Sequence, residues 1–232
     1  HARGLIELRR KIAQKLNQFN KLSYDPETEL CVTVGSSGAF ACSVLATLNP
    51  SDEVILVEPF YGYHLTTLIM AGITPKYARM DLATMTLDRS SFERAITRRT
   101  RAVVICTPSN PGGIVYSADD LKWLAALAVK HDLLVFSDEI YEYITYDGLK
   151  HVSAAGIADL RDRTMLVGGY SKTFSITGWR IGYLAAPADI MDKAAVASDL
   201  LYICAPHPLQ RGVLKGLDAP AEYYENMRRE YE

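Results

Sequence analysis

The chain has 232 residues, of which 49% are hydrophobic and 22% are charged, and its formal net charge is −2. This is the composition of an ordinary globular protein, with enough length for one large core or two small domains. The near-neutral charge gives no support for nucleic-acid binding, and no apolar run reaches the roughly 18 residues that suggest a membrane span.

The first elements can be read from hydrophobic spacing. Apolar residues recur with a helical period at Leu5, Leu8, Ile12, Leu16 and Phe19. This period predicts an amphipathic helix within residues 1–25. A strand-like run at 30–34 follows, and the small residues at 35–38 lead from it into an apolar helix expected at 39–48.

Strands and helices alternate along the rest of the chain. We expect strands at 53–57, 73–78, 101–106, 133–137, 164–167 and 181–186, and helices at 63–71, 91–97 and 117–131. Ser117 and Asp120 have the spacing of a capping box at the start of the last of these helices. Because the strands are continuous apolar runs, the pattern predicts an α/β fold with a mainly parallel sheet sandwiched by helices.

Polar clusters follow five of the expected strands, after Val34, Val57, Cys106, Ser137 and Val167. In mainly parallel sheets, ligands bind beyond the carboxyl ends of the strands. The sequence therefore predicts one binding crevice to which five strand ends contribute.

Three of these clusters could bind uncharged or anionic parts of a ligand, although each has an ordinary structural alternative. In the Gly-Ser-Ser-Gly run at 35–38, small residues would let backbone N–H groups approach an anion at a helix N-terminus, and a tight turn would use the same residues. Tyr61 could stack on a flat ring or pack in the core. Asn110 lies between two prolines that would aim its amide, as they would also shape a simple turn.

The other two clusters carry charge. Asp138 directly follows a buried strand, where a carboxylate is costly unless it meets a cation such as a protonated pyridine nitrogen. A helix cap or a surface charge is the alternative. Lys172 lies in an apolar, glycine-rich stretch and is a candidate Schiff-base amine, and Arg180 could grip a phosphate with its fork of donors. A surface lysine and a salt-bridged arginine are the alternatives.

The motifs occur in one order: the glycine/serine turn, P-F-Y, P-S-N-P-G-G, D-E-I-Y, S-K-T-F and G-W-R-I-G-Y. In order, spacing and flanking structure, this set resembles the large domain of fold type I pyridoxal-phosphate enzymes in the class I/II aminotransferase group. The resemblance extends from the helix at Arg9 to about Gln210. It implies the cofactor pyridoxal 5'-phosphate.

The resemblance also implies a role for each motif residue. Lys172 would bind the cofactor covalently, Asp138 would pair with its ring nitrogen and Tyr141 would hydrogen-bond its ring oxygen, which makes these three the candidate catalytic residues. The other contacts would come from Tyr61 on the ring face, Asn110 at the ring oxygen, and Ser36, Ser37, Gly38, Ser171 and Arg180 at the phosphate. The chain departs from the family pattern at Gly112, which replaces a threonine, and at Gly169, where many members carry a serine.

The activity that the resemblance implies is transfer of an amino group from an amino acid to a 2-oxo acid by a homodimer. Another reaction on the same scaffold, such as C–S or β-lyase chemistry, and a non-catalytic domain that senses pyridoxal phosphate remain alternatives. A nicotinamide-binding oxidoreductase is disfavoured because no G-x-G-x-x-G follows the first strand. The sequence does not identify the amino acid.

We interpret residues 1–25 as an N-terminal helix, 26–217 as the cofactor-binding large domain, and 218–232 as the start of a helix that leads to a small domain outside this chain. Four scattered cysteines, Cys31, Cys42, Cys106 and Cys204, lie among apolar residues and form no C-x-x-C pair. They are expected to be buried thiols in a reducing compartment, which indicates the cytoplasm. The five histidines are equally scattered, so a metal site is not expected.

Overall fold

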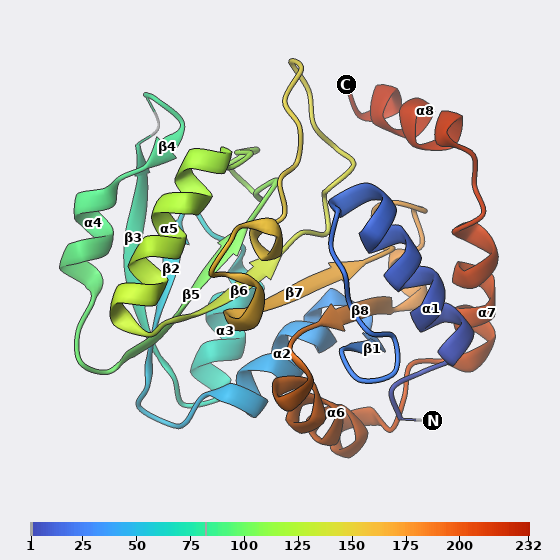
Figure 1. Ribbon diagram of the computed structural model, residues 1–232, viewed down its shortest axis with the longest axis horizontal. Coiled ribbons are helices and arrows are strands. Elements are labelled where there is room, and N and C mark those ends of the chain that lie inside the picture. Colours follow the sequence, from blue (N-terminus) through green and yellow to red (C-terminus); the bar gives the residue numbers. More distant parts are fainter. Residues whose placement is uncertain (1, 82) are drawn as a thin grey trace.

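A computed structural model describes residues 2–81 and 83–232 (Figure 1). Its centre is an eight-stranded sheet with the order β1-β8-β7-β6-β5-β2-β3-β4. The strands are β1 (Leu30–Val34), β2 (Glu53–Glu58), β3 (Thr74–Asp81), β4 (Thr86–Leu87), β5 (Thr100–Cys106), β6 (Leu134–Asp138), β7 (Thr164–Gly169) and β8 (Ile181–Ala185).

The predicted parallel core of the sheet is confirmed. Strands β3, β2, β5, β6 and β7 pair in parallel, in that spatial order. Strand β8 runs antiparallel to both β7 and β1, so β1 points in the same direction as the parallel strands. The direction in which strands are added reverses between β2 and β5. Such a reversal opens a crevice at the carboxyl edge of the sheet.

Helices cover both faces of the sheet (Figure 1). They are α1 (Ile6–Lys15), α2 (Gly35–Thr47), α3 (Gly62–Met70), α4 (Arg89–Ala95), α5 (Ala118–His131), α6 (Ala188–Tyr202), α7 (His207–Gly216) and α8 (Ala221–Tyr231). The core clusters place α2, α3 and α6 on one face, and α4, α5, α1 and α7 on the other. Helix α8 lies at the edge of the molecule, away from the sheet.

The two-sided burial explains the continuous apolar runs of the sequence. Along β2, Val54 and Leu56 pack beneath α2 and α3, whereas Ile55 and Val57 pack in the cluster with α4 and α5. Successive side chains of a strand point to opposite faces, so a strand covered on both sides needs an apolar residue at every position.

The differences from the sequence-based boundaries are small but affect the site. Helix α2 begins at Gly35, so the glycine/serine run forms its first turn and does not precede it. Asp138 is the last residue of β6 and does not follow it. The expected capping box between Ser117 and Asp120 is present at α5. Helices α6 and α7 were not predicted.

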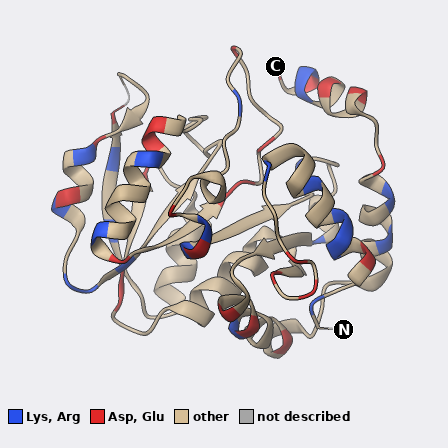
Figure 2. Cartoon of the chain, in the orientation of Figure 1, with Lys and Arg blue, Asp and Glu red and all other residues tan. Residues whose placement is uncertain are grey.

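The distribution of charge, the character of the helices and the state of the cysteines bear on three further expectations from the sequence. Acidic and basic residues are intermixed on the outer helices, and α2 carries no charge (Figure 2). None of the helices in the described residues combines the length and apolar character that crossing a membrane requires. All four cysteines are free thiols; three are buried as expected, but Cys204 is partly exposed.

Candidate active site

A cavity of about 280 Å³ lies at the carboxyl edge of the sheet. The segments that follow β1, β2, β5, β6 and β7 all contribute to its lining, as the order of the motifs predicts. Nine of the ten candidate site residues line it: Ser36, Ser37, Tyr61, Asn110, Asp138, Tyr141, Ser171, Lys172 and Arg180. Residues that the sequence did not single out line it as well, chiefly Phe40, Tyr63, His64, Thr67, Cys106 and Thr177.

The N-terminus of α2 forms part of the cavity wall. The helix has no side-chain cap and no acidic residue in its first turn, so its first N–H groups are not neutralised by a carboxylate of the helix itself. Gly35 has a φ of +70°, and a Cβ there would lie 2.4 Å from Nη2 of Arg180. Gly182 of β8 passes so close that its Cβ would lie 2.4 Å from the carbonyl carbon of Gly35. Because neither glycine has a side chain, β8, the first turn of α2 and the guanidinium of Arg180 can pack closely against one another.

Arg180 adds a full positive charge to this part of the wall. Its Nη2 donates to Oγ of Ser37 at 2.9 Å and its Nη1 donates to the carbonyl of Thr177 at 3.0 Å. Within the described part of the chain, no carboxylate forms an ion pair with Arg180. A helix N-terminus, two serines and an uncompensated guanidinium together make this part of the cavity suited to a phosphate.

Gly38 does not share this position. It lies one turn into α2, and a Cβ at Gly38 would lie 2.7 Å from the hydroxyl oxygen of Tyr202, at the end of α6. The residue is therefore a close-packing position between α2 and α6, and the lining of the cavity does not include it.

The cavity wall also contains a buried carboxylate. Asp138 is 6% exposed, and its Oδ1 accepts from the backbone N–H of Ile140 at 3.3 Å. Its Oδ2 lies 3.0 Å from Nε2 of His64 on α3, which donates because a carboxylate can only accept. His64 is 3% exposed and packs against the ring of Phe40, with 4.7 Å between ring centroids.

His64 is a site residue that the sequence reasoning missed. Its signal was its spacing, three residues after Tyr61 at the start of an expected helix, which brings both side chains to the same side of that turn. The rings of Tyr61 and His64 meet edge to face at 5.7 Å, and the ring of Tyr61 also stacks on Tyr63 at 5.3 Å.

An amine, a phenol and an amide also line the cavity. Nζ of Lys172 lies 5.8 Å from the ring centroid of Tyr141, and Nδ2 of Asn110 donates to the Tyr141 hydroxyl at 3.4 Å. Burial raises the pKa of Tyr141 above its ordinary value, so the phenol keeps its proton at neutral pH and can donate it in a hydrogen bond. The glycine at 112 has a steric reason, because a Cβ there would lie 3.0 Å from Oγ of Ser109.

Comparison with known proteins adds a family match across the chain. The model for the family "Aminotransferase class I and II" matches residues 1–232. A putative aminotransferase, YugH of Bacillus subtilis, is 38% identical over 98% of this chain and 59% of its own length. Aromatic-amino-acid aminotransferase 2 of Thermococcus litoralis is 35% identical over 99% of this chain and 60% of its own length.

Solved structures agree with this match. N-succinyldiaminopimelate aminotransferase from Mycobacterium tuberculosis superposes with a TM-score of 0.96 at 35% identity, over 99% of this chain and 60% of that one. Aspartate aminotransferase from Thermus thermophilus with maleate superposes with a TM-score of 0.92 at 35% identity, over 98% of this chain and 60% of that one. The chain thus spans about 60% of the length of the relatives that it matches.

Proposed function

Because the chain belongs to the aminotransferase class I and II family, we propose that it carries the cofactor-binding part of a pyridoxal-phosphate-dependent aminotransferase. The reaction is the transfer of an amino group from an amino acid to a 2-oxo acid. The observation that carries the proposal is that the Arg180 guanidinium, the Lys172 amine and the Asp138 carboxylate all line one cavity.

The donor set fits pyridoxal phosphate. The cofactor is a pyridine ring whose basic nitrogen lies opposite its carbonyl group, with a hydroxyl and a phosphate-bearing arm on the two ring carbons beside the carbonyl. Arg180, Ser36, Ser37 and Ser171 would hold the phosphate together with the α2 N-terminus. Asn110 and Tyr141 would bind the ring oxygen, Tyr61 would cover the ring face, and Asp138 would meet the ring nitrogen. We propose residues 26–217 as the unit that binds it.

The catalytic steps can be assigned to three side chains. When bound, pyridoxal phosphate supplies an electron sink for the bond that breaks at the substrate Cα. Asp138, desolvated and held by His64, would keep a proton on the nitrogen that it faces, because a buried carboxylate is strongly stabilised by a cation. Lys172 would remove the Cα proton at Nζ and later return a proton, acting as base and then as acid. The Tyr141 hydroxyl would donate a hydrogen bond to the ring oxygen of the cofactor.

The relatives of this chain do not point to one substrate amino acid. Relatives at similar identity carry names that refer to aromatic amino acids, to aspartate and to N-succinyldiaminopimelate. The cavity residues described above serve the cofactor, and they are compatible with any of these side chains.

We also propose that the chain functions as a homodimer through the surface of α6. Four large apolar side chains there are strongly exposed: Val196, Leu200, Leu201 and Ile203. Val196 and Leu200 are four residues apart, so they lie on one face of the helix, and an exposed apolar helix face is typical of an interface. Its neighbour in the fold is α2, since the α6 residue Tyr202 contacts Gly38 and lies 3.1 Å from Sγ of Cys42. A second copy bound here would adjoin the phosphate-binding part of the site. The four free thiols support a cytoplasmic location.

Substitution of Asp138 tests the proposed reaction. Asp138→Ala should slow the half-reaction with an amino acid roughly 10²- to 5 × 10³-fold, because removal of one partner of a buried pair costs about 3–5 kcal/mol. Release of the oxo acid and the change in cofactor absorbance report the rate. Asp119→Ala, at a carboxylate whose side chain is 85% exposed, is the matched control and should react at the parent rate. An equal rate in Asp138→Ala and the parent would remove Asp138 from the mechanism.

A further inference from the structure

Directly after Asp138, a second carboxylate is buried on the opposite face of the sheet. Glu139 is 1% exposed, and its carboxylate accepts four hydrogen bonds. The donors are Oγ of Ser137 at 2.7 Å, Nε2 of His151 at 2.9 Å, Oγ of Ser153 at 2.9 Å and the backbone N–H of Ala154 at 3.1 Å. Side chains alternate along a strand, so Asp138 faces the cavity while Glu139 faces away from it.

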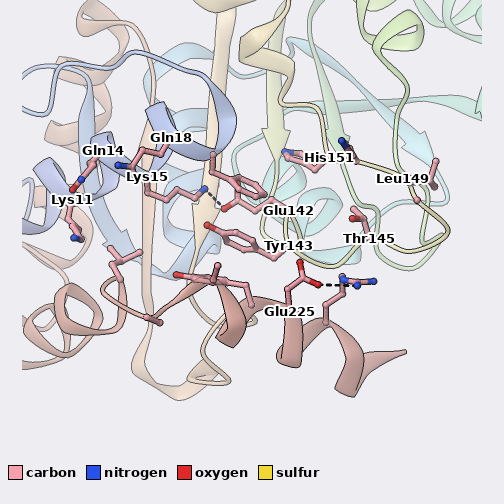
Figure 3. Close-up of a pocket in the computed structure, with 18 residues that line it drawn as sticks. Lys11, Gln14, Lys15, Gln18, Glu142, Tyr143, Thr145, Leu149, His151 and Glu225 are labelled. Atoms are coloured by element: carbon pink, nitrogen blue, oxygen red, sulfur yellow. Dashed lines mark hydrogen bonds and ion pairs between the residues drawn. The ribbon is translucent and has the colours of Figure 1, made fainter.

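These bonds close a loop. The backbone N–H of Glu139 donates to the carbonyl of Val167 at 2.9 Å, which fixes the start of the loop to β7. Residues 140–150 then leave the sheet, and the chain returns at His151, Ser153 and Ala154 to the same carboxylate. Figure 3 shows part of this segment, including Glu142, Thr145 and His151, along a second cavity of about 800 Å³.

Tyr141 lies two residues beyond the fixed point and one residue before Glu142, a second buried carboxylate that forms an ion pair with Lys15 and accepts from Nδ2 of Asn20 at 2.9 Å. The Tyr141 hydroxyl has one side-chain hydrogen bond in the described chain, the long 3.4 Å contact from Asn110. The backbone turn adds two more bonds: the N–H of Glu142 donates to the carbonyl of Glu139 at 3.1 Å, and the N–H of Ile144 donates to the carbonyl of Tyr141 at 2.7 Å. The placement of the phenol therefore depends on how firmly the loop is held at Glu139 and at Glu142.

The charges of Glu139 and His151 strengthen the contact between the two ends of the loop, which we call the clamp. The His151 side chain is only 2% exposed. Burial by itself would lower the pKa of His151, but the negative charges of Glu139 and Glu142 outweigh burial and the opposing Lys15, so the pKa is raised. Burial would likewise raise the pKa of Glu139, but His151 and the two serine hydroxyls outweigh it, so that pKa is lowered. Both directions favour a charged pair, and breaking a buried charged pair is costly.

We propose that Glu139 and His151 are a positioning pair that holds Tyr141 against the cofactor, although neither residue lines the 280 Å³ cavity in which the cofactor would bind. This role rests on the proposed function. The pair acts through the segment 140–150, of which Ile140 and Tyr141 line the 280 Å³ cavity. Of these two side chains, Tyr141 is the one with a hydroxyl that can hydrogen-bond the cofactor. A positioning role therefore predicts that the effect of the pair depends on the Tyr141 hydroxyl, whereas a general contribution to the fold does not.

A double-mutant cycle measures whether His151 acts on the cofactor through the Tyr141 hydroxyl. In the protein loaded with pyridoxal phosphate, His151→Gln should raise the dissociation constant of the cofactor roughly tenfold and shift its absorbance maximum in the same direction as Tyr141→Phe. When the Tyr141→Phe variant already lacks the hydroxyl, adding His151→Gln should change the constant less than about twofold. His207→Gln, at an exposed histidine of α7, is the control and should behave as the parent. Independent, multiplying effects of the two substitutions would overturn the proposal.

Hydrogen exchange tests the clamp without the cofactor. Amides of residues 140–150 should exchange at least about tenfold faster in Glu139→Gln, while those of β7 keep the parent rate. If Glu139→Gln does not fold, His151→Gln and Ser153→Ala, which each weaken one donor, replace it. Unchanged exchange in these variants would overturn the clamp. A parent protein that fails to bind pyridoxal phosphate would instead refute the proposed function, and hydrogen exchange would still decide the clamp.

Discussion

Nε2 of His64 and Oδ2 of Asp138 lie 3.0 Å apart, and both side chains are almost completely buried. The bond fixes the rotation of the carboxylate, and among the described residues Oδ1 has one partner, the backbone N–H of Ile140 at 3.3 Å. Helix α3 thus orients the last residue of β6 across the carboxyl edge of the sheet. A carboxylate held in this way can meet a cation without first reorganising.

Loss of the His64 donor should weaken cofactor binding. His64→Phe fits the aromatic surroundings but removes the hydrogen bond, and a bond to a charged group contributes about 1.5–3 kcal/mol. We expect the dissociation constant of pyridoxal phosphate to rise roughly tenfold or more, measured by absorbance titration. His64→Gln, which can still donate, should recover part of the affinity. Equal affinity in the parent and His64→Phe would show that the bond does not prepare Asp138 for the cofactor.

Loss of the Arg180 guanidinium should weaken the affinity for pyridoxal phosphate but should not prevent its covalent attachment to Lys172. Arg180→Ala is expected to raise the dissociation constant for pyridoxal phosphate roughly 10- to 100-fold, because it removes charge-assisted bonds to a phosphate. Lys172 should still be modified when the cofactor is in excess. Arg98→Ala, at an exposed arginine remote from the cavity, is the control. A parent-like constant in Arg180→Ala would place the phosphate elsewhere.

The raised pKa of His151 predicts how stability varies with pH. The folded chain binds this proton more tightly than the unfolded chain, so protonation stabilises the fold. The contribution is complete below the ordinary histidine pKa of about 6.5 and is lost as the pH rises through the higher folded value. The difference in free energy of unfolding between the parent and His151→Gln should therefore shrink as the pH rises above the ordinary histidine pKa of about 6.5, as measured in urea titrations. A difference that stays constant as the pH rises would contradict a charged pair.

The exposed face of α6 should govern association. Leu200→Glu places a charge on a side chain that is 81% exposed. If α6 forms the homodimer interface, sedimentation velocity should show this variant as a monomer under conditions in which the parent is a dimer. Val129→Glu, at an exposed apolar residue of α5, should leave the dimer intact. A dimeric Leu200→Glu would move the interface away from α6.

Much of the site could be predicted because the topology of a parallel sheet fixes where strand ends lie. Asn110 follows β5 and Asp138 ends β6, so both reach the same edge once the strands are known to be parallel. The orientation of Gly38 could not be predicted in this way. It depends on α2 starting at Gly35, which turns Gly38 toward Tyr202.

Two partnerships of the site depend on packing that no local pattern reveals. His64 meets Asp138 only because α3 lies across the end of β6, 74 residues further along the chain. Glu139 meets His151 only because the loop between them returns to its own start. As a sequence pattern, both histidines were isolated residues without a neighbouring ligand.

Covalent attachment at Lys172 is the central claim, and reduction with borohydride tests it most directly. The protein loaded with pyridoxal phosphate would be reduced, digested and mapped by mass spectrometry. Lys172 lines the same cavity as Arg180 and Asp138, so the reduced cofactor should be found on the peptide that contains Lys172 and should be absent from Lys172→Ala. Modification of another lysine, or of no lysine, would contradict the account.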